Sequence, residues 1–301
     1  MKGIRKIMQV IILTRSDKYN YGEDGGYCVA GIDPEAPDKW VRLCGPREHF
    51  KITNAEAVYE NGSLCEPLDL IEVDAVRINE NMVRACNAAG WGPDHEKAIY
   101  NENMLSIQPE NYLVDGRFRF IRKIDIDSLL NMAGFNPGPF IFGDSGRSLS
   151  IGDAIRNNSS LTMMKVDDLE LYPKKGKEDD GYQAHYRARF RYNGVVYDDI
   201  SVTDPDYLAK DTDFSGLTFG ESYLIMSLGE EFRERHYKLI AKIFEVVYVI
   251  GNNKKGMFHA LRDCPYLQKY NNVKYALYND AVAQGLVQCA ECKKRRDAQS
   301  E

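Results

Sequence analysis

Short apolar runs separated by turn residues dominate the first 250 residues, and this pattern leaves few folds open to the chain. The clearest case is two alternating runs, residues 186–192 and 195–200, joined by Asn193-Gly194, the strongest short signal for a β-hairpin. Further strands are predicted at residues 9–14, 26–32, 39–44, 68–77, 223–228 and 237–250. Helices are predicted at residues 125–133 and 278–284, each followed by a glycine that ends it. Because a doubly wound sheet needs helices between its strands, the pattern predicts a mainly β chain of small barrels or sandwiches.

The strands fall into two stretches, one before residue 135 and one from about residue 161 to 250. Between them, residues 135–160 are rich in proline, glycine and serine, which is typical of a connection between domains. A chain of 301 residues is long enough for two or three domains. We therefore expect a first domain at 1–134, a connection at 135–160, a second domain at 161–250 and a small module at 251–301.

The formal net charge of −6 is distributed unevenly along the chain. Residues 251–301 carry nine Lys and Arg against five Asp and Glu, a net of +4, so the first 250 residues carry −10. An acidic body argues against a nucleic-acid clamp over the whole surface, but it leaves room for a local basic site. The same acidity favours an alternative in which the partner is another protein.

Cysteine usage and the N-terminus bear on the cellular compartment. Seven cysteines are too few for a disulfide scaffold and odd in number, which favours a reducing environment. The apolar run at residues 7–13 is too short for an export signal or a membrane span. These features predict a cytoplasmic protein with no membrane partner.

Four residues near the C-terminus have the spacing of a metal site: His259, Cys264, Cys289 and Cys292. Structural zinc takes four nitrogen or sulfur ligands in a tetrahedron, and a two-residue gap turns two thiolates inward together. In a reducing compartment this spacing indicates Zn2+ as the cofactor, held in a closed structural site within a small α+β module. The alternative is that Cys289 and Cys292 form a redox pair, with His259 and Cys264 unconnected to them.

Two basic clusters are candidates for contacts with nucleic acid. The first follows the last cysteine and comprises Lys293, Lys294, Arg295 and Arg296. The second lies in the predicted hairpin and comprises Arg187, Arg189 and Arg191, which share one face of a strand because side chains alternate with period two. Cations spaced in this way suit successive phosphates. The alternatives are a solvated tail and a charged outer face that pairs with Asp198, Asp199 and the acidic residues 178–180.

The first part of the chain resembles a known family, the dual OB-containing domain of bacterial proteins. The resemblance rests on Lys18-Tyr19 and on residues 26–33, 39–42, 67–72, 108–112, 227–232 and 237–240, and it covers roughly residues 7–248. It implies two linked OB-like small barrels of five strands and a nucleic-acid or nucleotide ligand. It brings no set of catalytic residues with it.

Residues 256–292 resemble a second family, the zinc domain of bacterial DNA repair proteins that accept methyl groups from phosphotriesters. That domain uses four cysteines, one of which accepts the methyl group, whereas this chain has His259 at the first ligand position. The resemblance therefore implies metal binding without methyl transfer.

These observations predict a non-enzymatic protein that binds nucleic acid or a nucleotide and carries a structural zinc site. We further expect a place in a bacterial defence or repair system. The alternative is a protein-interaction adaptor subunit with no nucleic-acid ligand.

Overall fold

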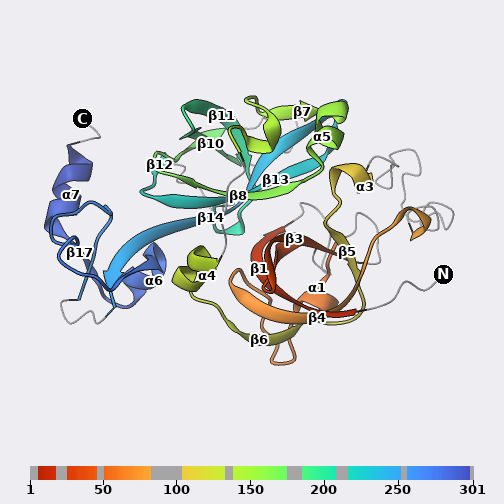
Figure 1. Cartoon of the computed structure of the whole chain (residues 1–301), viewed down its shortest axis with the longest axis horizontal. Coiled ribbons are helices and arrows are strands. Elements are labelled where there is room, and N and C mark those ends of the chain that lie inside the picture. Colours follow the sequence, from red (N-terminus) through yellow and green to blue (C-terminus); the bar gives the residue numbers. More distant parts are fainter. Residues whose placement is uncertain are drawn as a thin grey trace.

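The computed structural model describes residues 6–17, 26–45, 51–82, 104–132, 138–174, 185–207, 216–251 and 256–298. It contains two β units and a small C-terminal module (Figure 1). The chain is mostly β, which confirms the predicted fold class. Within the described part, no helix has the length and apolar character needed to cross a membrane.

The first unit is a closed barrel of five strands. These are β1 (Lys6–Asp17), β2 (Tyr27–Asp33), β3 (Ala36–Cys44), β4 (Asp69–Arg77) and β5 (Asn111–Val114). Strand β1 pairs with both β4 and β2, and the barrel closes because β5 pairs in parallel with β3 and antiparallel with β4. This order is that of an OB fold, and the apolar faces of the strands fill the interior with residues such as Val10, Val29, Val41 and Ile71.

Gly31 permits β1 to change partners within the barrel. Residues 6–11 of β1 pair with β4, and from Ile11 onward β1 pairs with β2, with a bulge before Thr14. At this crossing a Cβ on Gly31 would lie 1.9 Å from the carbonyl oxygen of Ile11. Only glycine allows the two backbones to approach this closely.

Four short elements lie in the same stretch of sequence as the first barrel. Strand β6 (Arg119–Lys123) pairs with β4 and ends the sheet. The helices are α1 (Asn54–Ala57), α3 (Met104–Ile107) and α4 (Ile126–Met132). Helix α4 confirms the helix predicted at 125–133.

The second unit repeats this strand order in an open half-barrel sheet, which we call the second barrel. Its strands are β8 (Leu161–Val166), β9 (Glu170–Lys174), β10 (His185–Tyr192), β11 (Val195–Val202), β13 (Ser222–Phe232) and β14 (Arg235–Ile250), with β12 (Leu217–Thr218) added beside β9. Strand β8 pairs with β13, and β9 pairs with β10. Strands β8 and β9 together therefore take the place that β1 has in the first barrel. Strand β11 pairs in parallel with β14, as β3 does with β5. A 3-10 turn, Pro205–Tyr207, follows β11.

Much of the segment expected as a connection packs into the second core. It forms a 3-10 turn (Ile141–Gly143), β7 (Ser148–Ser150), which pairs with β14, and α5 (Ile151–Asn157). The side chains of Ile141, Phe142, Leu149 and Ala154 are buried among residues of β10, β11 and β13. Residues 135–137 lie outside the described residues. We propose that the second domain begins at about residue 138, ahead of the expected boundary.

The two barrels meet through a shared apolar core. Side chains of β1 and β2, including Ile11, Leu13 and Ile32, cluster with Ile225 of β13 and Phe244 of β14. Beside them, the guanidinium of Arg42 donates to the hydroxyl groups of Ser160 (2.8 Å) and Ser227 (3.2 Å) in the second unit. The contact includes both apolar packing and specific polar bonds, which hold the barrels in one orientation.

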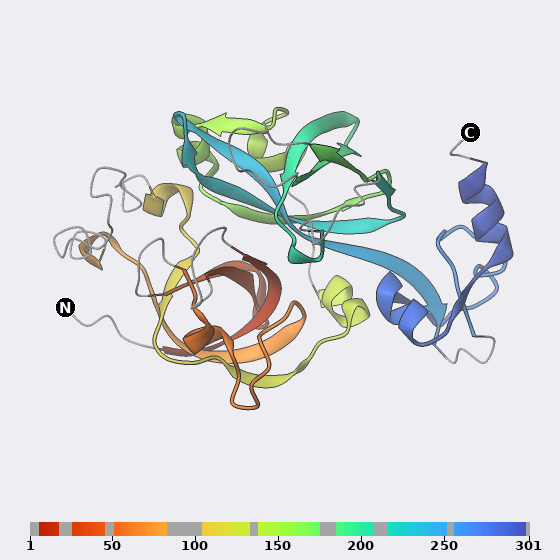
Figure 2. The same cartoon turned by 180° about the vertical axis from the view of Figure 1, so that it is seen from behind.

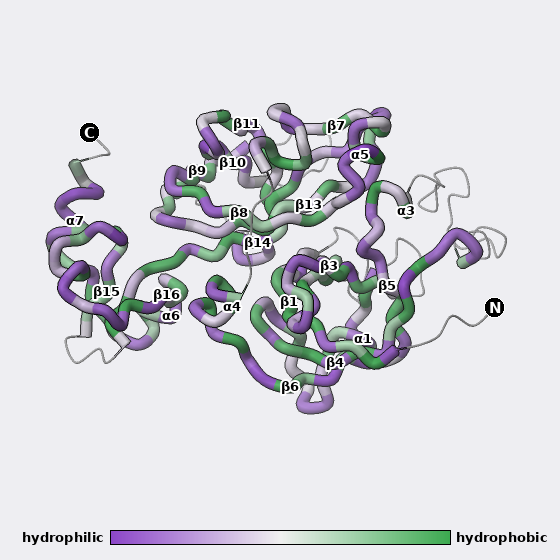
Figure 3. The backbone as a smooth tube through the Cα atoms, viewed as in Figure 1, coloured by the Kyte–Doolittle hydropathy of each residue, from purple (hydrophilic) through white to green (hydrophobic). Residues whose placement is uncertain are grey.

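Strand β14 runs out of the second barrel into the C-terminal module (Figure 2). The module contains β15 (Met257–Phe258), β16 (Val273–Leu277), α6 (Tyr278–Ala283), β17 (Val287–Gln288) and α7 (Ala290–Asp297). Residues 246–250 of β14 pair with β16, so the module shares a strand with the barrel. Helix α6 confirms the helix predicted at 278–284, whereas α7 was not predicted and is hydrophilic along most of its length (Figure 3).

Candidate functional site

The structure brings the four predicted metal ligands together in the C-terminal module. All are buried, and their ligand atoms lie within 4.8 Å of one another. The Nδ1 atom of His259 lies 3.3 Å from the Sγ atom of Cys264 and 3.8 Å from that of Cys292. The sulfurs of Cys264 and Cys289 are 4.0 Å apart. Four buried donors at these distances could hold a metal ion.

The separations agree with a tetrahedral site. With metal–ligand distances of about 2.0–2.3 Å, tetrahedral zinc separates its ligand atoms by roughly 3.5–3.8 Å. The three cysteines of the site are free thiols, since a disulfide would require sulfurs at about 2.05 Å. The alternative in which His259 and Cys264 are unconnected to Cys289 and Cys292 is therefore wrong.

Three backbone features place the ligands. His259 exchanges two backbone hydrogen bonds of 2.8 Å with Tyr248, which fixes it beside β14. The N–H of Cys289 donates to the carbonyl of Phe258, which brings the last two cysteines next to the first pair. Cys292 lies in the first turn of α7, and Cys289 immediately precedes that helix. The sequence could suggest these four candidates because the members of each pair lie only a few residues apart.

The environment of the ligands suits coordination of a cation. Burial lowers the pKa of His259, which favours the neutral imidazole that a metal requires. Burial acts to raise the pKa of Cys289, but the N–H groups of Cys292 and Glu291 bring it below the ordinary value. A thiolate is thereby favoured at Cys289, whereas burial raises the pKa of Cys292 to about 12.

The basic tail is a helix, and its four predicted cations differ in their contacts with the rest of the protein. Arg295 pairs with Asp263 at 2.7 Å. Arg296 lies near Glu245 of β14. Burial raises the pKa of the Glu245 carboxyl, and the charge of Arg296 offsets part of that increase. Lys293 and Lys294 are exposed. The tail is therefore partly attached to the protein itself, and two of its four cations face solvent.

The predicted alternation in β10 is confirmed. Ala188 and Phe190 are buried in the second core, while Arg189 and Arg191 are exposed and Arg187 is half-buried on the outer face. Arg189 pairs with Asp198 at 2.9 Å, and the Arg191 guanidinium lies 3.9 Å from Asp168. The expectation that Asp198 and Asp199 pair with this face is met, whereas residues 178–180 lie outside the described residues.

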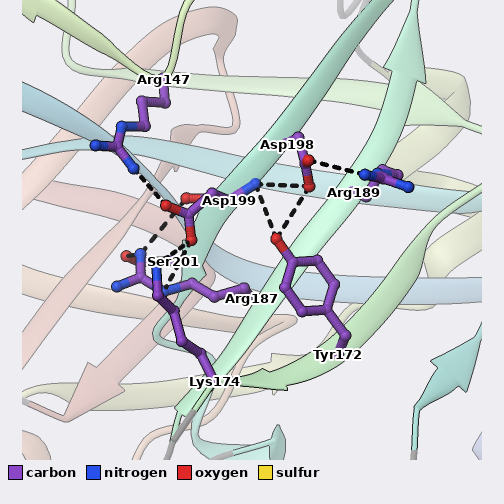
Figure 4. A network of polar contacts seen from close by, with 8 residues as sticks. All are labelled: Arg147, Tyr172, Lys174, Arg187, Arg189, Asp198, Asp199 and Ser201. Atoms are coloured by element: carbon purple, nitrogen blue, oxygen red, sulfur yellow. Dashed lines mark hydrogen bonds and ion pairs between the residues drawn. The ribbon is translucent and has the colours of Figure 1, made fainter. Parts of the chain in front are cut away.

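A bulge in β11 places two acidic residues opposite one arginine. Between the pairs Ala188–Ile200 and Phe190–Tyr197, both Asp198 and Asp199 oppose Arg189. Asp199 has φ of 56°, in the left-handed region, so the two successive carboxylates face the arginine side together (Figure 4). Pairing with Arg189, together with the Tyr172 hydroxyl, lowers the pKa of Asp198 to about 2.

We define the anion cluster as Arg147, Tyr172, Lys174, Arg187, Arg189, Asp198, Asp199 and Ser201 (Figure 4). Three cations surround the Asp199 carboxylate: Arg147, Lys174 (2.7 Å) and Arg187 (3.6 Å). Arg187 also donates to the hydroxyl of Ser201. Glu170 of β9 lies directly opposite Arg189, so the four cations of the cluster face three carboxylates and retain one excess positive charge.

Arg147 reaches the cluster from a loop that precedes the second barrel's strands in the sequence. The Nζ atom of Lys238, whose side chain is fully buried, donates to the carbonyl groups of Asp144 (2.5 Å) and Gly146 (2.6 Å). The Tyr197 hydroxyl accepts from the Ile141 N–H and donates to the Asp144 carbonyl, both at 3.1 Å. These bonds fix the loop and direct Arg147 to Asp199. No local pattern indicated this contact, because it joins positions 52 residues apart.

Comparison with known proteins identifies the two barrels. The model of the dual OB-containing domain matches residues 8–88 and 97–243 and stops before the metal ligands. No curated protein and no solved structure matches the chain. The matched residues make up most of the chain and coincide with the two units of matching strand order described above. The chain therefore belongs to the dual OB-containing domain family.

Proposed function

We propose that this protein is a non-enzymatic binding protein for nucleic acid or a nucleotide, and that its ligand contacts the anion cluster on the second barrel. The observation that carries the proposal is the single Asp199 carboxylate among Arg147, Lys174 and Arg187. Because the cations outnumber the acidic groups, the cluster can accept further anionic oxygens. A phosphate is the anion that nucleic acids and nucleotides share.

The place of the cluster in the fold supports this proposal. By their pairing, β10 and β11 are the second and third strands of the second barrel. OB folds bind oligonucleotides on the face made by these two strands. The predicted Arg187, Arg189 and Arg191 lie there, joined by Arg147 and Lys174. Lys293 and Lys294 on α7 offer a second, more exposed basic group.

The metal centre supports a structural role for zinc. His259, Cys264, Cys289 and Cys292 would hold the ion, and four protein ligands complete a tetrahedron. The ion would crosslink a module whose buried core is two small clusters, one of the cysteine ligands with Tyr248, Ala260 and Leu267, the other of Val247, Phe258 and Ala281. Structural zinc of this kind contributes directly to folding free energy.

The setting we propose is a bacterial defence or repair system in the cytoplasm. Support comes from the resemblance of residues 256–292 to the zinc domain of phosphotriester repair proteins. Methyl transfer is not part of the proposal, because His259 replaces one of that domain's four cysteines.

The experiment that tests the proposal is fluorescence anisotropy with labelled single-stranded and duplex DNA and RNA at two salt concentrations. We expect binding that weakens with salt, and a salt slope reduced by about one for each phosphate contact removed by Arg147→Ala or Lys174→Ala. Lys123→Ala is the matched control, since Lys123 is as exposed as Lys174 but lies on the first barrel. Absence of binding by the wild-type protein at low salt would refute the proposal.

A protein-interaction adaptor is the second candidate, and β6 favours it. This strand ends its sheet, and all five of its residues are exposed, with Phe120 at 48% and Ile121 at 42%. An open strand edge can pair with an extended segment of another protein. A protein partner retained after nuclease treatment, and lost on disruption of β6, would support this alternative.

A further inference from the structure

An aromatic surface lies at the tip of the β13–β14 hairpin. Phe232 is 59% exposed, and its ring centroid lies 6.3 Å from that of Tyr237. Phe232 pairs across the hairpin with Arg235, so Phe232, Arg235 and Tyr237 share one face. Arg235 is held there by two bonds to Ser148, at 2.7 and 2.8 Å. The rings are thus presented on a hairpin that is fixed to β7.

The turn of this hairpin has an unusual backbone. Arg233 and Glu234, its two central residues, have φ of 53° and 60°, both in the left-handed region. Such a turn normally uses Asn-Gly, and left-handed conformations are unfavourable at other residues. The conformation places the Arg233 guanidinium 5.1 Å from the Phe232 ring centroid. The tip therefore carries an exposed ring with a cation over it.

Arg147 connects these rings with the anion cluster. Its guanidinium lies 5.9 Å from the Tyr237 ring centroid and also pairs with Asp199. Contacts thus run without interruption from Asp199 through Arg147 and Tyr237 to Phe232. Glu231 pairs with His236 on the opposite face of the hairpin. The exposed Glu230 and Glu234 each lie two residues from Phe232 in the chain, so the nearby Arg147, Arg233 and Arg235 must outweigh them for an anion to bind.

We propose that Phe232 and Tyr237 form a base-stacking platform and that the ligand of the second barrel is a single-stranded nucleic acid. This inference rests on the proposed function and specifies its ligand class. Unpaired bases expose their flat faces and stack on exposed aromatic rings, whereas bases within a duplex are covered by their neighbours. Phosphates of the same strand would lie at Arg147 and the neighbouring cations, and Arg233 adds a cation at the far end.

The test compares a labelled oligodeoxythymidine, an abasic oligomer of equal length and a hairpin duplex. Phe232→Ala is expected to weaken oligodeoxythymidine binding about tenfold, the usual effect of removing one stacking residue. Binding of the abasic oligomer should not change, and Phe232→Trp should restore the lost affinity. Phe120→Ala is the matched control, because Phe120 is similarly exposed on the first barrel.

The outcomes separate this inference from the proposed function. If Phe232→Ala binds oligodeoxythymidine like the wild type, or weakens both oligomers equally, the stacking platform is refuted while phosphate binding stands. If the wild type binds the abasic oligomer as tightly as the oligodeoxythymidine, the stacking platform is likewise refuted and phosphate binding stands. If the wild type binds none of the three at low salt, both the proposed function and this inference are lost. Unchanged thermal unfolding of Phe232→Ala would show that the variant is folded.

Discussion

The carboxylate of Asp199 accepts a hydrogen bond of 2.7 Å from Lys174, although the two residues are 25 positions apart and Asp199 adopts a left-handed backbone. The bulge in β11 makes this contact possible, because it turns Asp199 to the face that carries the arginines. The Asp199 carboxylate thus competes for the cations that we propose contact a ligand phosphate.

Replacing Asp199 with Asn should strengthen anion binding. Asparagine tolerates the left-handed region, so the bulge is retained while the competing charge is removed. We expect affinity for a single-stranded oligonucleotide to rise about fivefold, which corresponds to about 1 kcal/mol for one partly exposed ion pair. Anisotropy at low salt measures this change.

Asp74→Asn is the control for Asp199→Asn, since Asp74 pairs with Arg119 on the first barrel at 3.1 Å and changes the net charge equally. If both variants raise affinity to the same extent, the effect is one of overall charge, and the anion cluster is not the binding site.

Loss of the metal should unfold the C-terminal module. We expect the purified protein to contain one zinc ion per chain by mass spectrometry, and Cys264→Ser to lose most of it. Because β16 pairs with β14, the loss should also lower the thermal stability of the second barrel.

Cys65→Ser provides the comparison for the metal experiment, because Cys65 is a buried free thiol in the first barrel. Full zinc content in Cys264→Ser, or an equal loss in Cys65→Ser, would contradict the assignment of ligands.

Gly31→Ala should destabilise the first barrel strongly. The added Cβ would meet the Ile11 carbonyl oxygen at 1.9 Å, so one of two paired backbones must move. We expect a loss of about 3 kcal/mol or more in the free energy of unfolding, measured by urea denaturation.

Gly62→Ala is the control for Gly31→Ala, because it tests a left-handed backbone conformation at a glycine that no other backbone approaches closely. Gly62 has φ of 83° with open space around it, so its replacement should cost only about 1–2 kcal/mol. Equal losses in the two variants would show that the approach of Gly31 to Ile11 is not the decisive feature.

The buried Lys238 should make stability depend on pH above neutrality. Burial lowers the pKa of Lys238 from its ordinary value of 10.5 to about 8. The Asp144 carboxylate only partly offsets this decrease. Between about pH 8 and 10.5 the unfolded chain binds a proton that the folded chain does not, so this group's contribution to stability rises with pH, by at most about 3 kcal/mol.

Comparing wild type with Lys238→Met isolates that contribution. The variant leaves the carbonyls of Asp144 and Gly146 without their buried donor, so we expect a loss of roughly 1–3 kcal/mol at neutral pH. Urea denaturation at several pH values checks both effects. A wild-type-minus-variant difference that does not change across this pH range would show that Lys238 does not titrate there.

The sequence by itself was sufficient for features that local chemistry dictates. The hairpin at Asn193-Gly194 and the alternation of Ala188 and Phe190 with the arginines follow from turn preference and the two-residue period of a strand. The four candidate metal ligands, which the structure brings together, could be predicted because the members of each pair lie within a few residues of each other. The mainly β fold class followed from the same local patterns.

Tertiary structure decided the features that join distant segments. The bulge that turns Asp199 outward, the loop that brings in Arg147 and the sharing of β14 with the metal module involve residues brought together by pairing across the sheet. The hydrophobic pattern of a strand does not reveal where its partner gains or loses a residue. Nor does it show that a segment rich in proline and glycine will bury Ile141 and Leu149 in a core built by strands that follow it. Such contacts depend on packing the whole chain, because burial of apolar surface acts between segments regardless of their separation in sequence.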